Sequence, residues 1–212
     1  MRKATFVVIV LILLSFILSI YFYSQMPERM APLWNSQGKV DGYTSKLCGL
    51  FLMPLVITGI AVMFLIIPKI DPMKENIEKF SNHYDRFIII LILFLVFVQV
   101  HILLWNVGIH IRSNVFFPMG LGVLLYYTGI LVENAERNWF IGIKTPWTLS
   151  SDRVWKKTNR IGGKLLKIAG IIAITGSFFK EYILFFIIVP VLSITGFTIV
   201  YSYVEYQKEL RA

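Results

Sequence analysis

The chain has 212 residues, of which 57% are hydrophobic and 16% are charged, and its mean hydropathy is +0.70. A soluble core cannot hide so much apolar surface, so this composition excludes a water-soluble globular protein and predicts an integral membrane protein. The net charge of +9 requires no nucleic-acid partner, because the basic residues are spread over several loops, where anionic lipid attracts them. A single cysteine, Cys48, excludes an internal disulfide and a cysteine metal cluster.

Six apolar segments are long enough to cross about 30 Å of hydrocarbon, which takes about 20 helical residues. The first is expected to be a retained helix, because no small-residue cleavage site follows it. The fifth is the least apolar, since Lys164 and Lys167 lie in its first half; a re-entrant hairpin with the sixth, turning at Lys180 and Glu181, is the alternative. The predicted spans are residues 5–23, 47–67, 87–107, 115–132, 161–179 and 182–203. We therefore predict an all-α, polytopic membrane protein with six transmembrane helices.

Basic residues are distributed unevenly between the two sides of this arrangement. Fifteen Lys and Arg residues lie on the side of the two termini, and five lie on the opposite side. Because cytoplasmic loops are the more basic ones, both termini are expected to be cytoplasmic. Residues 1–67 then form an N-terminal helix hairpin with an outside loop. Residues 68–212 form a four-helix membrane part with a cytoplasmic loop at 133–164.

The first outside loop, residues 26–46, is rich in proline, glycine and turn-forming polar residues, so a compact turn structure is expected. Trp34 and Tyr43 suit a membrane interface. Two interpretations remain open, namely a plug that caps the helix bundle and a surface that contacts an outward-facing ligand. The candidate residues of this loop are Pro32, Trp34, Asn35, Gly38, Asp41 and Gly42.

The second loop, residues 69–86, begins with Asp71 and Pro72, an N-cap residue followed by proline at the first helical position. Its apolar residues recur at helical spacing and predict an amphipathic helix on the inner leaflet. Docking of a partner is the alternative. The apolar face consists of Met73, Ile77, Phe80 and Tyr84.

The fourth loop contains three of the five tryptophans, which neither solubility nor topology requires. Gly142 and Pro146 interrupt the preceding helix, and Ser150 or Ser151, followed by Asp152, can cap a new one. That new helix is expected to be basic and amphipathic, to lead into the fifth span, and to be open to interruption at 162–163. It serves either to orient the protein on anionic lipid or to dock an acidic cytoplasmic protein. Its basic face comprises Arg153, Lys156, Lys157, Arg160, Lys164 and Lys167.

The membrane interior carries little titratable chemistry. His101 is the one ionisable group well inside a predicted span, and no Asp or Glu accompanies it, so an interhelical hydrogen bond is expected rather than a proton pathway. Gly120, Gly122 and Gly129 in the fourth span allow close helix approach. No catalytic signature is present, so we predict a protein that is not an enzyme and uses neither a cofactor nor a metal.

Two motifs resemble a known family. The fourth-loop motif runs from Asn138 to Leu149 (NWFIGIKTPWTL) and continues in Val154-Trp155 and in Lys157-Thr158-Asn159-Arg160. It resembles the signature of the SdpI family of bacterial membrane immunity proteins. The first loop is similar to the small N-terminal domain of that family through Pro27, Pro32, Trp34, Asn35, Gly38, Asp41, Gly42 and Lys46.

The resemblance implies a six-helix protein of the cell membrane that protects its cell from a secreted, membrane-active killing peptide. It also implies a receptor that holds a small cytoplasmic autorepressor at the membrane once toxin meets the first loop. The rival hypotheses are a small transporter that exports the toxic substrate and, third, a membrane enzyme. The residues implied to bind the partner are Asn138, Trp139, Gly142, Lys144, Thr145, Pro146, Trp147, Thr148, Trp155, Lys156, Lys157 and Arg160.

Overall fold

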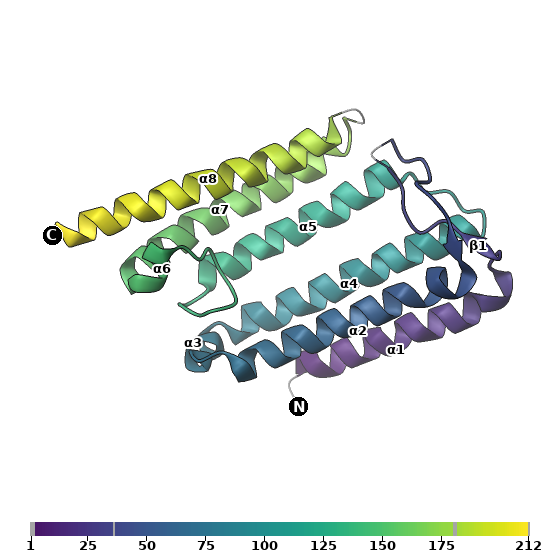
Figure 1. The fold of residues 1–212 in the computed structure, drawn as a ribbon, viewed down its shortest axis with the longest axis horizontal. Coiled ribbons are helices and arrows are strands. Elements are labelled where there is room, and N and C mark those ends of the chain that lie inside the picture. Colours follow the sequence, from purple (N-terminus) through teal and green to yellow (C-terminus); the bar gives the residue numbers. More distant parts are fainter. Residues whose placement is uncertain (1–2, 36, 180–181, 212) are drawn as a thin grey trace.

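The computed structural model describes residues 3–35, 37–179 and 182–211, and nearly all of its regular structure is helical. Two groups of three long helices lie next to each other (Figure 1). The first group contains α1 (Lys3–Phe22), α2 (Lys46–Ile70) and α4 (Ser81–Asn106), and the second contains α5 (Ser113–Asn134), α7 (Asp152–Gly176) and α8 (Ile183–Leu210). The short elements are η1 (Tyr23–Gln25), β1 (Arg29–Met30), β2 (Thr44–Ser45), α3 (Lys74–Lys79) and α6 (Pro146–Ser150).

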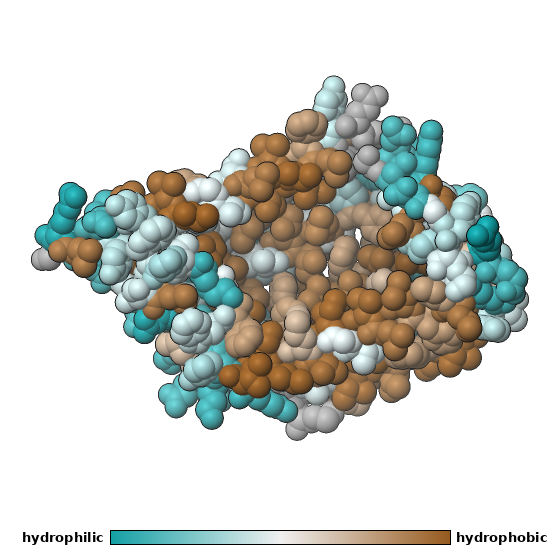
Figure 2. All heavy atoms as spheres, viewed as in Figure 1, coloured by the Kyte–Doolittle hydropathy of each residue, from teal (hydrophilic) through white to brown (hydrophobic). Residues whose placement is uncertain are grey.

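Five of the described helices are long and apolar enough to cross a membrane, namely α1 with η1, α2, α4, α5 and α8. Apolar side chains dominate the middle of the surface, and polar ones gather at both ends (Figure 2). Five of the six predicted spans are therefore confirmed as apolar helices. The sixth, α7, has 25 residues, but its charged first half leaves it outside this set. The turn predicted at Lys180 and Glu181 lies outside the described residues.

All six long helices run along one axis of the molecule. The start of α1 and the end of α8 lie toward the end of the molecule that carries α3 and α6, whereas the two strands lie at the opposite end (Figure 1). This arrangement agrees with an even number of passes. Which end faces the cytoplasm stays a prediction, as does the division of the chain at residues 67 and 68.

The helices α5 and α7 approach until their backbones touch at two places. A Cβ atom added to Gly129 would lie 2.5 Å from the Gly163 carbonyl oxygen, and one added to Gly122 would lie 2.7 Å from the Gly170 carbonyl oxygen. Seven residues separate the glycines on each helix, which is about two turns, so they share one face. No side chain fits at these positions. The predicted close approach is confirmed for Gly122 and Gly129, and α7 runs through Gly162 and Gly163 without interruption.

Polar side chains join the helices of the first group inside its apolar core. Gln99 on α4 accepts a hydrogen bond from the Ser15 hydroxyl at 2.6 Å and donates to the Ser19 hydroxyl at 3.0 Å. All three side chains are buried. Such bonds hold apolar helices together where lipid competes with side-chain packing.

The second loop folds into the bundle instead of lying on the inner leaflet. α3 begins at Lys74, and Asp71 accepts a hydrogen bond from the Met73 backbone N–H at 2.6 Å. The apolar face predicted to meet acyl chains packs into the main core instead, because the ends of α2 and α4 offer it apolar surface there. The buried residues of that face are Ile77, Phe80 and Tyr84.

The first loop, residues 26–46, is compact as predicted, and we call it the outer cap. β1 and β2 pair antiparallel, with Arg29 opposite Ser45 and Met30 opposite Thr44. Asn106, at the end of α4, accepts a hydrogen bond from the Ala31 backbone N–H and donates one to the Ala31 carbonyl oxygen. The outer cap is thereby attached to the end of the first helix group.

Substitution of Gly129 by Ala should push α5 and α7 apart, because the new methyl group would overlap a carbonyl oxygen. We expect a loss of about 1–3 kcal/mol in the free energy of unfolding, the usual cost of overpacking. Gly196→Ala on α8 is the matched control, since a Cβ atom there meets nothing within 4 Å. Unfolding in denaturing detergent, followed by circular dichroism, measures both, and equal midpoints would contradict the close contact.

Candidate functional site

The candidate site is the segment 135–151 between α5 and α7, which we call the inner loop. Asn138 organises its first half. The Asn138 Oδ1 atom accepts hydrogen bonds from the backbone N–H groups of Phe140 and Ile141, and its Nδ2 atom donates to the carbonyl oxygens of Glu136 and Ile141. The Asn138 side chain is completely buried. These four hydrogen bonds satisfy both N–H groups and both lone pairs of its amide within the loop.

The inner loop is bound to the second loop, far away in the sequence. Asp71 accepts a hydrogen bond from the Trp139 backbone N–H at 3.0 Å, and Asn76 donates one to the Arg137 carbonyl oxygen at 2.8 Å. Asp71 is buried, so its carboxylate serves only the backbone of these two segments. The two loops therefore form one folded unit that joins the two helix groups at this end of the molecule.

Gly142, at the centre of the inner loop, packs against Trp155 and Asn159 of α7. Gly142 has a φ angle of +119°, and a Cβ atom there would lie 2.8 Å from both the Asn159 side chain and the Trp155 ring. The Trp155 Nε1–H donates to the Ala135 carbonyl oxygen at 2.7 Å, and Asn159 Oδ1 accepts from the Ile143 backbone N–H at 2.7 Å. Glycine is required here both for its backbone conformation and for the space it leaves.

The second half of the inner loop is the short helix α6. Thr145 and Thr148 cap its start reciprocally, because each hydroxyl accepts a hydrogen bond from the other residue's backbone N–H. Pro146 occupies the first helical position, where no backbone donor is needed. The Thr145 hydroxyl also bonds the Ser202 hydroxyl of α8 at 3.0 Å. α6 is thus attached to the last helix.

Much of the charge on the predicted basic face is neutralised within the protein. Ion pairs join Lys156 to Glu136 on the inner loop, Lys157 to Glu205 on α8 and Lys167 to Glu133 on α5. Ser151 caps α7 by accepting the Val154 N–H, as the sequence predicted. In the described parts of the chain, no ion pair involves Arg153, Arg160 or Lys164, all of which are exposed.

Glu133 and Arg137 are four residues apart, but they do not form a salt bridge. α5 ends at Asn134, so the two side chains leave the helical spacing that would bring them together. Arg137 instead pairs with Asp152 at 2.8 Å, and its guanidinium donates to the Leu149 carbonyl oxygen.

The predicted partner-binding residues divide into two classes. Four are buried and hold the inner loop together, namely Asn138, Thr145, Thr148 and Trp155. The others are exposed or partly exposed, namely Trp139, Gly142, Lys144, Pro146, Trp147, Lys156, Lys157 and Arg160. Trp139 is 54% exposed and Phe140 is 38% exposed, which places two adjacent aromatic side chains on the surface.

Sequence reasoning missed the contribution of residues outside the motif. The sequence pattern predicts only the start of a helix at Asp71 and gives no role to Ser202 or Glu205 on α8. Asn159 belongs to the family motif but is not among the predicted site residues. Its position one helical turn after Trp155 was the available signal, because both side chains then face the same loop.

At the other end of the molecule, the candidate residues of the outer cap also divide into residues that pack inward and residues that are exposed. The Trp34 ring turns inward and packs against His101 and Trp105, with ring centroids 4.7 and 5.2 Å apart. Asn35, Asp41 and Gly42 are exposed, whereas Pro32 and Gly38 are partly buried. Leu33 and Tyr43, 64% and 66% exposed, add apolar surface beside them.

His101 makes the predicted interhelical hydrogen bond. Its Nε2 atom lies 2.8 Å from the Ser113 hydroxyl at the start of α5, and both side chains are buried. Across residues 3–35, 37–179 and 182–211, no three His, Cys, Asp or Glu side chains come together in a way that could hold a metal ion.

Two protein-family models match separate parts of the chain. A model of the SdpI/YfhL protein family matches residues 134–202, and a model of a domain of unknown function, DUF1648, matches residues 10–58. The chain is also 31% identical, over 207 residues, to the immunity protein SdpI of Bacillus subtilis (strain 168), and the alignment covers 97% of both proteins. The chain belongs to the SdpI family. No solved structure matches it.

Membership of the SdpI family confirms the resemblance read from the two motifs. With the five apolar helices, it identifies a multi-pass protein of the cell membrane. The family match covers the inner loop, α7 and most of α8, and the DUF1648 match runs from α1 through the outer cap into α2. Both candidate sites therefore lie in segments that the family models describe.

Replacing Asn138 by Ala should open the inner loop locally. The backbone N–H groups of Phe140 and Ile141 would lose their acceptor, at about 1–3 kcal/mol for each unsatisfied group. Their amide hydrogen exchange should therefore accelerate at least about tenfold. Asn134→Ala is the control, because that exposed side chain donates only to the Ile130 carbonyl oxygen of its own helix. Equal exchange in both variants would contradict the role of Asn138.

Proposed function

We propose that this protein confers immunity to a secreted peptide that attacks the cell membrane, without acting as an enzyme. The observation that carries the proposal is the 31% identity with the immunity protein SdpI, because it extends over 97% of both chains and includes both loops.

The proposed topology has six crossings with both termini in the cytoplasm. α7 serves as the sixth crossing, because the acidic partners on α5 and α8 compensate Lys157 and Lys167. The outer cap then faces the outside and the inner loop faces the cytoplasm. The toxic peptide meets the exposed part of the outer cap, where Leu33 and Tyr43 present apolar surface to water.

On the cytoplasmic side, the proposed second role is the capture of a repressor protein at the membrane. Its docking surface consists of the exposed Trp139 and Phe140 together with the unpaired Arg153 and Arg160. Exposed aromatic and arginine side chains are the usual anchors of protein interfaces. The buried residues of the motif keep this surface in shape without contacting the partner.

The rival hypothesis, a small exporter, has less support. A transport route needs polar side chains that face a cavity within the membrane. Gln99 bonds Ser15 and Ser19, and His101 bonds Ser113. These side chains are buried between helices, where they stabilise helix packing and do not line a transport route. Protection that depends on an ion gradient would revive the exporter hypothesis.

A survival assay tests immunity. Sensitive cells that express the protein should tolerate a higher concentration of at least one peptide from a panel of membrane-permeabilising peptides. Leu33→Ser combined with Tyr43→Ser should lower the tolerated concentration about tenfold, since two apolar contacts are worth about 1–3 kcal/mol. The control combines Gln37→Ser with Lys39→Ser, which are exposed in the same loop. If the wild-type protein protects against no peptide, the immunity proposal fails.

Recruitment of a repressor can be followed by fluorescence microscopy of a fusion protein in cells exposed to the peptide. Arg153→Glu combined with Arg160→Glu should release the fusion protein from the membrane, because both charges of the docking surface are reversed. The fold should survive, since neither arginine forms an ion pair among the described residues. Lys74→Glu combined with Lys79→Glu on α3 is the control for charge at the same side. Unchanged recruitment in the first variant would exclude this docking surface.

A further inference from the structure

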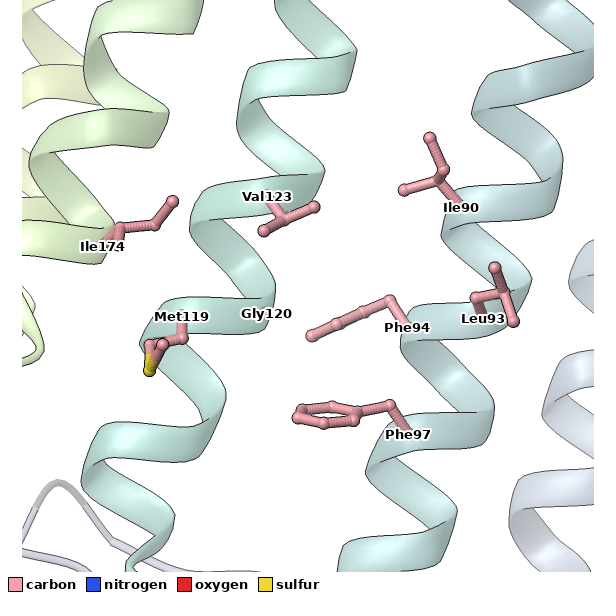
Figure 3. Close-up of a pocket in the computed structure, with 8 residues that line it drawn as sticks. All are labelled: Ile90, Leu93, Phe94, Phe97, Met119, Gly120, Val123 and Ile174. Carbon is pink, nitrogen blue, oxygen red and sulfur yellow. The ribbon is translucent and has the colours of Figure 1, made fainter.

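A groove lined by apolar side chains separates the two helix groups between α4 and α5. It has a volume of about 400 Å³, and its eight lining residues carry no polar side-chain atoms that could hold water. Phe94 and Phe97 reach from α4 toward α5, while Val123 and Ile174 close the opposite wall (Figure 3). The space-filling view is hollowed between the same two groups of helices (Figure 2).

The helix groups touch on either side of this groove. Toward the outer cap, the rings of Phe97 and Phe116 stack with centroids 3.5 Å apart, and His101 stacks on Phe116 at 4.4 Å. Toward the inner loop, Leu131 of α5 and Trp155 of α7 belong to the same buried cluster as Ile88 and Ile92 of α4. The groove is therefore a gap in an otherwise packed contact, and the described side chains do not fill it.

On the side of the outer cap, a second hollow adjoins the groove and carries a positive charge. This hollow, lined by Arg112, Val115 and Phe116, shares Met119 with the groove. Arg112 lies just before α5 and is exposed, and no acidic side chain pairs with it in the described part of the chain. A guanidinium group in this position can bind a phosphate through two parallel hydrogen bonds.

The dimensions match one leaflet of a bilayer. Eleven residues separate Arg112 from Val123, which is about 16 Å along a helix and about half of the 30 Å hydrocarbon thickness. Arg112 therefore lies at the level of the headgroups when Val123 lies near the middle of the membrane. An acyl chain attached to a phosphate at Arg112 would follow the groove down to Val123.

We propose that this groove is a phospholipid site, in which Arg112 binds the phosphodiester and one acyl chain fills the gap between α4 and α5. The lipid completes the contact between the two helix groups. A phospholipid is favoured over a second protein chain because the groove pairs one charge at its mouth with an interior as deep as one leaflet. The inference does not rest on immunity, and it holds for either orientation of the protein.

Photo-crosslinking tests the site in the full-length protein, reconstituted in bilayer nanodiscs that contain phosphatidylglycerol with a diazirine on its acyl chain. Labelled peptides should map to residues 90–97 of α4 and 119–123 of α5. Arg112→Gln should lower this labelling at least about tenfold, because the phosphate loses its charge-assisted hydrogen bonds to the guanidinium. Val123→Phe should lower it by filling the groove. A phosphatidylcholine probe, which carries the same phosphodiester, should label the same residues if Arg112 recognises the phosphodiester and not the rest of the headgroup.

Two matched variants serve as controls. Arg29→Gln removes an exposed arginine of the outer cap, and Val62→Phe enlarges a side chain on α2 that is 47% exposed, against 44% for Val123. Neither should change labelling at α4 and α5. Size-exclusion chromatography and circular dichroism show whether each variant is folded. If the Val123→Phe variant does not fold, the Arg112→Gln variant still tests the site independently.

Two outcomes would overturn the proposal. Wild-type labelling at α4 and α5 no stronger than on the exposed face of α2 would mean that only bulk lipid passes the groove. In the second outcome, native mass spectrometry finds dimers of the chain without retained lipid, and the Val123→Phe substitution makes these dimers dissociate. A second copy of the chain would then be the occupant of the groove.

Discussion

The contact between the backbones of α5 and α7 is the constraint on which the rest of the structure depends. Four glycines, Gly122 and Gly129 on one helix and Gly163 and Gly170 on the other, bring the two helix axes close together over about two turns. In lipid, where apolar side chains gain little by leaving one apolar medium for another, such close van der Waals contact is a principal source of helix association. It also allows a polar helix to enter the bundle.

The position of α7 determines the inner loop. α7 carries Trp155 and Asn159, and the inner loop starts at the end of α5, so the distance between these helices sets how far the loop must reach. The hydrogen bonds from Trp155 to Ala135 and from Ile143 to Asn159 fit only that spacing. Asp71 then extends the same network to the first helix group through the Trp139 backbone. A change in the conformation of the inner loop can therefore affect both helix groups together.

Charge compensation explains how a basic helix fits beside apolar ones. Glu133 of α5 and Glu205 of α8 face Lys167 and Lys157, so two charges of α7 are matched by its neighbours. Arg153 and Arg160 remain available at the surface. The basic face of α7 is therefore not a uniform strip of free charge, and a helical projection of the sequence cannot show which of its residues meet an acidic side chain on another helix.

The sequence by itself determined the class of the protein, five of its membrane spans and the start of α7 after Ser150 or Ser151, because hydrophobicity, helix length and capping are local properties. It also identified the family, since both motifs are contiguous. Only the tertiary structure decided which motif residues are buried, that α3 joins the core, and that Asp71 and Glu205 complete the inner loop. These contacts join segments 48 to 68 residues apart, and no local pattern specifies such pairings before the helices pack.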